Sequence, residues 1–416
     1  MVNVTSTLKE VLRYFKYFFK ALAYGLCIGA VGGLIGTAFC YAIGWATEFR
    51  EAHRYIVWLL PLGGALIIFL YNINGLRPAD TNGILTAVRS SDPIHASTGP
   101  LIFIGTVITH FFGGSAGREG AALQLGGVLG WHTARLFRQG EKDSHLFVMT
   151  GMSAVFAALF GTPVTAAVFA LEVISVGILQ FSALVPCLCS ALTAATIAKM
   201  LGVPSESFFL PAVDFSLANI GGTVLIAAAA ALMSIVYCIC MHKGHKIAAK
   251  LLPNPYIRVM AAGLAVALIS WLLGTGDYNG AGMAVIHRAL EGEARTEAFA
   301  IKLVLTVITM SCGFKGGEIV PAMFIGATLG CVLGSLVGLP AGLGAAMGLI
   351  AMFCGSLNCP LSGILLGLEL FGGELLPFYA IAAAIGYMLS VDYGLFSQQK
   401  LMYSKLRPEF IDSYAR

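Results

Sequence analysis

Residues 113–130 read Gly-Gly-Ser-Ala-Gly-Arg-Glu-Gly-Ala-Ala-Leu-Gln-Leu-Gly-Gly-Val-Leu-Gly, and the rest of the chain is interpreted from this stretch outward. Arg118 and Glu119 stand side by side between two glycines, within strongly apolar sequence. A charged pair at membrane depth is costly unless it is paired or lines a polar path. Glycines on both sides let the backbone leave its helix and turn amide N–H groups toward a ligand. The stretch therefore predicts an anion site at a helix N-terminus, with a built-in carboxylate that competes for it.

Composition places the chain in a membrane. Of its 416 residues, 58% are hydrophobic and 11% are charged, and the mean hydropathy is +0.84. Soluble domains carry about 25% charged residues, so we expect a polytopic, all-α membrane protein surrounded by lipid. A net charge of only +4 argues against nucleic acid as a partner. Walker, Rossmann and H-E-x-x-H patterns are absent from the sequence, and we expect neither a cofactor nor a metal.

Residues 1–20 predict a separate basic amphipathic helix on a membrane face. Lys9, Arg13, Lys16 and Lys20 alternate with apolar residues at helical spacing. Basic segments favour the cytoplasmic side, so this side is expected for the N-terminus.

The chain from residue 21 onward is a nearly unbroken series of apolar segments. They fall at about 21–47, 55–71, 98–113, 119–137, 146–160, 163–176, 180–200, 219–241, 256–274, 297–313, 319–338, 342–357, 360–371 and 375–391. Many are shorter than the roughly 20 residues that a simple spanning helix needs, which is typical of broken and re-entrant helices. The longest polar loops are expected near 77–97, 138–146 and 242–256.

An internal repeat divides the chain. Residues 106–130 and 306–330, aligned without a gap at an offset of 200, share ten identities over twenty-five positions, among them Gly117 with Gly317. Glu172 and Glu369 are related at an offset of 197, each nine residues after a proline. Two repeats in one membrane chain are the mark of a secondary transporter whose site lies at the repeat interface. We therefore predict a first half over 21–200, a second half over 219–391 and a C-terminal segment over 392–416.

Four short segments stand out along the chain: Thr81-Asn82-Gly83-Ile84-Leu85, Gly117-Arg118-Glu119-Gly120, Gly316-Gly317-Glu318-Ile319-Val320-Pro321 and Lys400-Leu401-Met402-Tyr403-Ser404. In order and spacing they resemble the anion-site motifs of the CLC family of channels and antiporters. The resemblance covers nearly the whole chain, from about 20 to 405.

The resemblance implies a homodimer with one pathway per subunit, built from two inverted halves, whose helix N-termini converge on a partly dehydrated halide. Helix N-termini offer partial positive charge and N–H donors without a full countercharge that would trap the ion. Glu119 matches the gating glutamate, which takes the anion's place and leaves it when protonated. The remaining matched positions form the anion site: Asn82, Gly117, Arg118, Gly120, the backbone amides of Glu318 and Ile319, Val320, and the hydroxyl of Tyr403.

Departures from the chloride-type pattern resemble the fluoride/proton antiporter branch of the family, found in bacteria. Asn82 replaces a serine in the first loop, and Glu318 adds a carboxylate to the second motif. Val173 stands where the family has its inner proton acceptor, directly after Glu172. We expect Glu318 to carry protons in its place. Val320 has no hydroxyl, although this branch can carry threonine there.

Several of these residues also have a purely structural interpretation. Arg118 can pair with a carbonyl or carboxylate, Asn82 can cap a helix, Glu318 can pair with Lys315, and Tyr403 can belong to an interfacial aromatic belt. For Glu172 and Glu369 the structural role is favoured over chemistry. His110 and His287 are expected to be satisfied by helix neighbours, and His242 and His245 to lie in a solvated basic loop.

The leading functional prediction is a fluoride/proton antiporter that exports fluoride across a bacterial inner membrane. The alternative within the family is a chloride channel or chloride/proton exchanger, and Val173 fits a channel as well as it fits the fluoride branch. A membrane-embedded enzyme using Arg118 and Glu119 is the rival of another class. It requires a second polar cluster at membrane depth, and apart from Glu172, Glu318 and Glu369 the sequence offers none.

Overall fold

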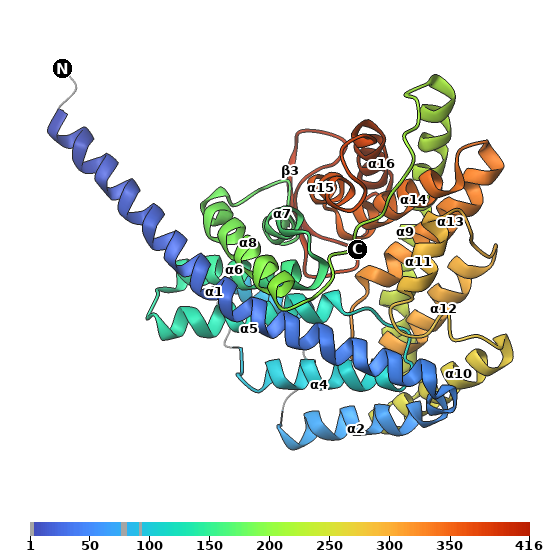
Figure 1. The fold of residues 1–416 in the computed structure, drawn as a ribbon. Coiled ribbons are helices and arrows are strands. Elements are labelled where there is room, and N and C mark those ends of the chain that lie inside the picture. The colour runs from blue at the N-terminus through green and yellow to red at the C-terminus, as the bar shows by residue number, and fades with distance from the viewer. Residues whose placement is uncertain (1–3, 76–80, 91–93) are drawn as a thin grey trace.

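The computed structural model describes residues 4–75, 81–90 and 94–416, which form two helical halves side by side (Figure 1). The helices of the first half are α1 (Val4–Ala52), α2 (Leu60–Ile73), α3 (Thr81–Ser90), α4 (Thr98–Phe111), α5 (Glu119–Leu136), α6 (Glu141–Phe160), α7 (Pro163–Glu172) and α8 (Leu184–Met200). Those of the second half are α9 (Leu217–Leu251), α10 (Pro255–Leu273), α11 (Met283–Leu290), α12 (Ala298–Ser311), α13 (Ile319–Val337), α14 (Ala341–Leu357), α15 (Pro360–Phe371) and α16 (Leu376–Leu389). Two 3₁₀ helices, η1 (Arg54–Leu59) and η2 (Phe181–Ala183), complete the helical part.

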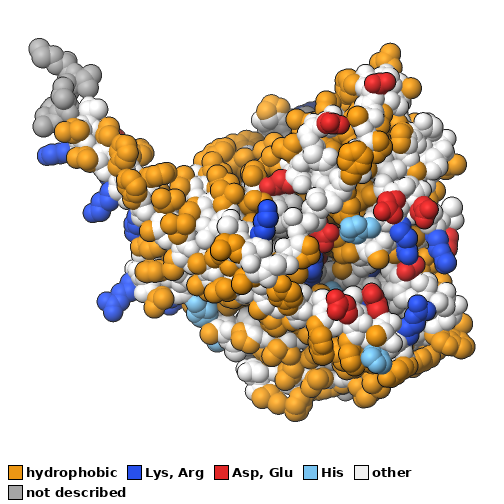
Figure 2. All heavy atoms as spheres, in the orientation of Figure 1, with side chains coloured by type: hydrophobic (Ala, Val, Ile, Leu, Met, Phe, Trp, Pro, Cys, Tyr) orange, Lys and Arg blue, Asp and Glu red, His pale blue; other side chains and the backbone are white. Residues whose placement is uncertain are grey.

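The predicted all-α membrane fold is confirmed. Among the described residues, seven helices are long and apolar enough to cross a membrane, and six apolar helices are shorter. A small three-stranded sheet accompanies them, in the order β1 (Ser175–Val176), β2 (Lys400–Tyr403), β3 (Phe410–Tyr414), with β1 parallel and β3 antiparallel to β2. Figure 2 shows a broadly hydrophobic surface on one face, with charged side chains gathered near its middle.

The repeat in the sequence is a repeat in the structure. Helices α4 and α12 have bounds that differ by 200 residues, and α5 and α13 begin at the same offset. Each of α4 and α12 is followed by a glycine with a left-handed backbone, Gly113 at φ 85° and Gly313 at φ 114°. Only glycine adopts this conformation readily, which explains why the chain turns at the same place in both halves.

Close helix crossings hold each half together. Helix α5 meets α6 at Gly126 and Gly151, and α13 meets α14 at Gly326 and Gly348. An added Cβ at any of these glycines would lie 2.1–2.4 Å from the carbonyl oxygen of its partner glycine. Small residues at such crossings allow the close backbone approach that drives helix packing in membranes, and this packing fixes the positions of the α5 and α13 N-termini.

Several predicted boundaries are wrong. Helix α1 is continuous across residue 20, and its residues 7–20 are exposed because it extends away from the body (Figure 1). Residues 242–251 continue α9, so His242 and His245 lie on a helix and not in a loop. The expected loops at 77–97 and 138–146 contain α3 and the start of α6. A prediction from hydropathy finds the apolar part of a helix and assigns its polar end to a loop, so the predicted helix ends differ from those of the structure.

Candidate functional site

The site is built where the two halves touch at Gly117 and Gly317. These repeat partners form an isolated antiparallel bridge, in which each amide N–H donates to the other's carbonyl at 2.7 Å. The surrounding contacts are reciprocal too, because the amide of Ser115 donates to Thr309 at 3.1 Å and the amide of Lys315 donates to Thr109 at 3.2 Å. Contacts that exchange equivalent residues imply an approximate two-fold axis at this point, and the bridge brings the starts of α5 and α13 together.

The carboxylate of Glu119 lies at this junction. Its side chain is 1% exposed, and the backbone N–H of Arg118 donates to its Oε2 at 2.9 Å. The backbone amide of Val320, in the first turn of α13, also lies beside the carboxylate. The carboxylate therefore lies where the starts of α5 and α13 meet, and helix starts carry unpaired N–H groups and the positive ends of the helix dipoles. A negative oxygen already occupies a site suited to an anion.

The residues predicted from the second motif lie at the start of α13. Glu318 is its N-cap and Ile319 its first residue, and both Ile319 and Val320 are fully buried. The hydroxyl of Tyr237, on α9, donates to the carbonyl of Glu318 at 3.0 Å. Tyr237 thereby fixes the backbone at the predicted donor site. No sequence signal separates it from the other aromatic residues of an apolar helix.

Asn82 lies in the first turn of α3, inside the helix and not at the capping position. Its Oδ1 accepts a hydrogen bond from the backbone N–H of Gln398 at 3.1 Å. The neighbouring Thr81 accepts from Gln124 of α5 at 3.0 Å, so α3 is tied to the helix that carries Glu119.

Tyr403 lies on β2, with 42% of its surface exposed, and its ring meets Phe410 of β3 edge-on at a centroid distance of 5.7 Å. Its inner-donor role stays a prediction. Gln399, directly before β2, is a fully buried polar residue that sequence analysis missed. Its Nε2 donates to the carbonyls of Val173 and Leu357 at 2.9 and 2.7 Å, and its Oε1 accepts from Asn358 at 2.9 Å.

Glu172 and Glu369 cap each other's helices, as the structural interpretation predicts. Glu172, at the end of α7, accepts from the amides of Leu361 and Ser362 at the start of α15, at 3.1 and 2.9 Å, and from the Ser362 hydroxyl at 2.5 Å. Glu369, near the end of α15, accepts from the amides of Val164 and Thr165 at the start of α7, at 2.9 and 2.8 Å. Each carboxylate satisfies orphan N–H groups of the other half.

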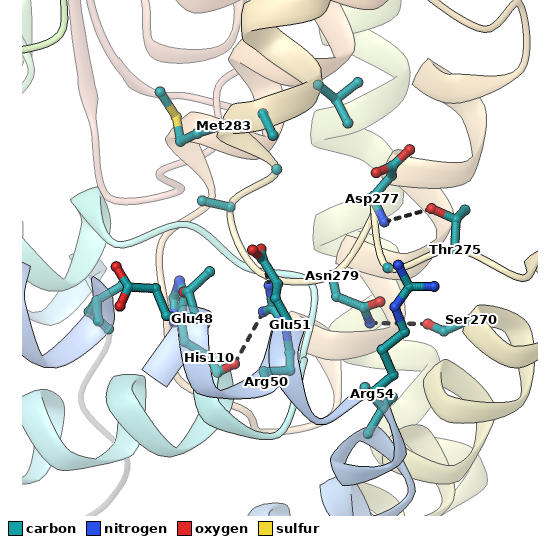
Figure 3. A pocket seen from close by; sticks show the side chains of 18 of the residues that line it. Glu48, Arg50, Glu51, Arg54, His110, Ser270, Thr275, Asp277, Asn279 and Met283 are labelled. Atoms are coloured by element: carbon teal, nitrogen blue, oxygen red, sulfur yellow. Dashed lines mark hydrogen bonds and ion pairs between the residues drawn. The ribbon is translucent and has the colours of Figure 1, made fainter. Parts of the chain in front are cut away.

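Arg118 connects the junction to a cavity of about 690 Å³. Its guanidinium lies 3.7 Å from Oε1 of Glu119 and 3.6 Å from Oε1 of Glu206, both measured from nitrogen. The structure thus realises the pairing interpretation of Arg118. The cavity is also lined by the end of α1, by Arg54 at the start of η1 and by the segment before α11, and their charged side chains are labelled in Figure 3.

Two further buried cations belong to this region, since Arg50 lines the cavity and Lys302 contacts the segment before α11. Sequence analysis singled out neither of them. Lys302, fully buried on α12, donates to the carbonyls of Tyr278 and Gly280 at 3.1 and 2.6 Å. Arg50 is 5% exposed and donates to the carbonyl of His110 at 3.2 Å (Figure 3). A lone lysine within the apolar segment 297–313 is the signal that could have been used.

The two histidines expected to be satisfied within their helices differ. His110 conforms, since its Nδ1 lies 2.9 Å from the carbonyl of Thr106, one turn earlier. For His287 the expectation is wrong, because the ring is 46% exposed and its Nε2 lies 3.4 Å from Oε2 of Glu206.

Two related halves, with opposed helix N-termini around a buried carboxylate, define a membrane transport protein of the inverted-repeat class. The chain belongs to the family of the voltage gated chloride channel, the CLC family, whose model matches residues 74–391. It is 33% identical over 406 residues to a chloride/fluoride channel protein of Pseudomonas syringae pv. tomato, covering 95% of this chain and 90% of that protein.

Solved structures agree with this assignment. A crystal structure of a CLC-type fluoride/proton antiporter matches with a TM-score of 0.88 and 34% identity, covering 92% of this chain and 98% of that one. A slow cyanobacterial Cl⁻/H⁺ antiporter matches with a TM-score of 0.76 and 17% identity, covering 89% and 94%, and at that identity the likeness shows the fold alone.

Proposed function

We propose that this protein is a fluoride/proton antiporter that exports fluoride, and that Glu119 is its gate and proton carrier. One observation carries the proposal. The Glu119 carboxylate accepts a hydrogen bond from the Arg118 amide at the start of α5 and lies beside the Val320 amide at the start of α13. An anion that replaces this carboxylate receives the same donors. Protonation removes the charge that holds the side chain there, which links proton binding at Glu119 to anion entry.

Fluoride suits this junction better than a larger halide does. It is small and a strong hydrogen-bond acceptor, so compact donors such as backbone amides and the NH₂ group of Asn82 compensate best for its lost hydration. The bridge between Gly117 and Gly317 keeps the two helix starts close, and a side chain at Gly120 would meet Gly317 Cα at 3.0 Å. The 34% identical structural relative is a fluoride/proton antiporter, which supports the same choice.

The proton route in this proposal passes from Glu119 toward Glu318. Glu172 is occupied as a helix cap, and Val173 beside it has no titratable group. Glu318 is the partly buried carboxylate at the N-cap of α13, the helix whose Val320 amide lies beside the Glu119 carboxylate. We therefore assign the inner proton step to Glu318, and the inner anion donor to the Tyr403 hydroxyl.

The orientation follows from α1. Its exposed N-terminal part carries Lys9, Arg13, Lys16 and Lys20, which places that end in the cytoplasm by the positive-inside rule. The end of α1 lines the cavity above Arg118, so the cavity faces outward. We place the protein in a bacterial inner membrane as a homodimer with one pathway per subunit. Cross-linking in native membranes tests the dimer.

Transport by purified protein in liposomes tests the function, with fluoride and chloride electrodes and a pH indicator recorded together. We expect fluoride efflux accompanied by proton uptake, and little chloride flux. Glu119→Gln abolishes proton coupling, whereas Glu374→Gln, at an exposed site after α15, leaves it unchanged. Chloride flux equal to fluoride flux would instead support the chloride channel or exchanger, and coupled exchange that persists in Glu119→Gln would show that the gate is misassigned.

A further inference from the structure

A second carboxylate competes for the arginine of the gate. Glu206 comes from the segment that connects α8 to α9, at residues 201–216, and lines the outward cavity together with Arg118. It is 20% exposed, against 14% for Arg118 and 1% for Glu119. No motif of the sequence includes it.

The geometry makes Arg118 a shared partner. Its Nε lies 3.7 Å from Oε1 of Glu119, and its Nη2 lies 3.6 Å from Oε1 of Glu206. One guanidinium therefore stands between a buried carboxylate at the junction and a carboxylate in the cavity. Neither distance is as short as the charge-assisted hydrogen bonds of about 2.7–2.9 Å that a fully committed pair makes, so the arginine is divided between the two.

His287 of α11 contacts the other oxygen of Glu206, with Nε2 at 3.4 Å from Oε2. Its ring packs against Phe208 at a centroid distance of 4.5 Å, which holds the imidazole beside the cavity. Histidine is the side chain that commonly changes charge near neutral pH. The Glu206 carboxylate thus contacts Arg118, which is always positively charged, and His287, which is positively charged only when its imidazole is protonated.

The other charged and titratable groups that line the cavity are Glu48, Arg50, Glu51, Arg54, His110 and Asp277. Several are engaged elsewhere. Arg50 lies 3.3 Å from Glu51, and Asp277 lies 2.8 Å from Arg288. The ion pairs that reach Glu206 come from Arg118 and His287.

We propose that Glu206 is a positioning residue for the gate, which draws Arg118 away from Glu119 and so sets the external pH at which transport proceeds. When Glu119 takes up a proton and loses its charge, Arg118 stays paired with Glu206. The positive charge of the guanidinium is therefore still balanced by a carboxylate. When His287 is protonated, it engages Glu206 and returns Arg118 to Glu119. This inference rests on the proposed function, because it requires Glu119 to carry protons.

Substitutions of Glu206 and His287 are expected to shift the external pH of half-maximal transport in opposite directions. Glu206→Gln removes a negative charge near Glu119 and leaves Arg118 to that carboxylate alone, so protonation of Glu119 requires a lower pH. The external pH of half-maximal transport moves in the acid direction, by about 0.5 to 1 pH unit for charges separated by a guanidinium in a hydrated cavity. His287→Gln frees Glu206 and moves this midpoint in the alkaline direction.

Fluoride efflux from liposomes, measured against external pH at fixed internal pH, tests the proposal. The double variant Glu206→Gln with His287→Gln is expected to have the same pH midpoint as Glu206→Gln alone, because His287 acts only through Glu206. In Glu206→Asp the midpoint is expected to lie between those of Glu206→Gln and wild type. Glu291→Gln, an exposed carboxylate at the end of α11, is the matched control. In Glu206→Gln the maximal efflux rate at acid pH is expected to equal that of wild type. A merely structural defect would lower this maximal rate.

The proposal is overturned if Glu206→Gln and wild type share one midpoint, if both single variants move it in the same direction, or if their shifts add in the double variant. If Glu206→Gln does not yield folded protein, Glu206→Asp and His287→Gln decide between these outcomes. Failure of the proposed function is separate, since wild type itself then shows no proton coupling.

Discussion

The reciprocal caps of Glu172 and Glu369 predict a measurable loss of stability when either carboxylate becomes an amide. Glu172→Gln keeps one acceptor oxygen and turns an NH₂ group toward amides that need an acceptor. Of the three hydrogen bonds at 2.5–3.1 Å, one or two are lost. Hydrogen bonds to charged groups contribute about 1.5–3 kcal/mol each, and the helix dipole adds up to about 1 kcal/mol.

We therefore expect Glu172→Gln to lower the free energy of unfolding by about 2–4 kcal/mol. Glu369 accepts two bonds instead of three, so Glu369→Gln is expected to have a smaller effect of the same kind. Both changes loosen the contact between α7 and α15, which lie together near the centre of the molecule (Figure 1).

Thermal unfolding of the purified protein in detergent measures this loss, and size-exclusion chromatography confirms that each variant is folded. Glu374→Gln, an exposed carboxylate close to Glu369 in the chain, serves as the control. The reasoning is refuted if both cap variants melt with the control. Loss of proton coupling in Glu172→Gln at an unchanged melting temperature would show instead that Glu172 transfers protons.

Two further predictions concern packing and the C-terminal segment. In Gly348→Ala the added Cβ would lie 2.2 Å from the carbonyl oxygen of Gly326, so we expect α13 to shift, the free energy of unfolding to fall by about 1–3 kcal/mol and fluoride efflux to slow. Gly221→Ala is the control, because nothing lies within 4 Å of its added Cβ, and it is expected to be neutral or stabilising. Equal behaviour of the two variants in thermal unfolding and efflux would contradict the close-crossing argument. Lys405→Met removes three hydrogen bonds of 2.5–2.9 Å from Nζ to Asn358, Tyr387 and Ser390, so limited proteolysis should cleave the segment after residue 400 faster than in wild type, and an unchanged rate would show that the β-strands alone hold it.

Local features of the sequence were sufficient for much of the fold. The apolar segment 360–371 matches α15 (Pro360–Phe371), and 319–338 matches α13 to within one residue. Hydrophobicity and proline or glycine punctuation act over a few neighbouring residues, so they can be read directly. The position of Glu119 at a helix start is of this kind, because Gly113 and Gly114 end the preceding helix and Gly117 stands two residues before Glu119.

Helix ends and strands were harder to predict from the sequence. Residues 242–251 include five histidines and lysines and are still helical, because α9 continues beyond its apolar part. Tyr403 lies on a strand whose partners are Ser175 to Val176 and the last residues of the chain. The pairing of β2 with β1 joins segments more than 200 residues apart and leaves no local pattern.

The sequence by itself determined that the protein is a membrane protein of two related halves, with a carboxylate at a glycine-bounded helix start. Only the tertiary structure decided what that carboxylate meets: the amide of Val320 from the other half, and an arginine shared with Glu206. The physical reason is that residue type fixes solubility and local backbone, whereas the charge environment of Glu119 depends on how two halves separated by about 200 residues pack across their common axis.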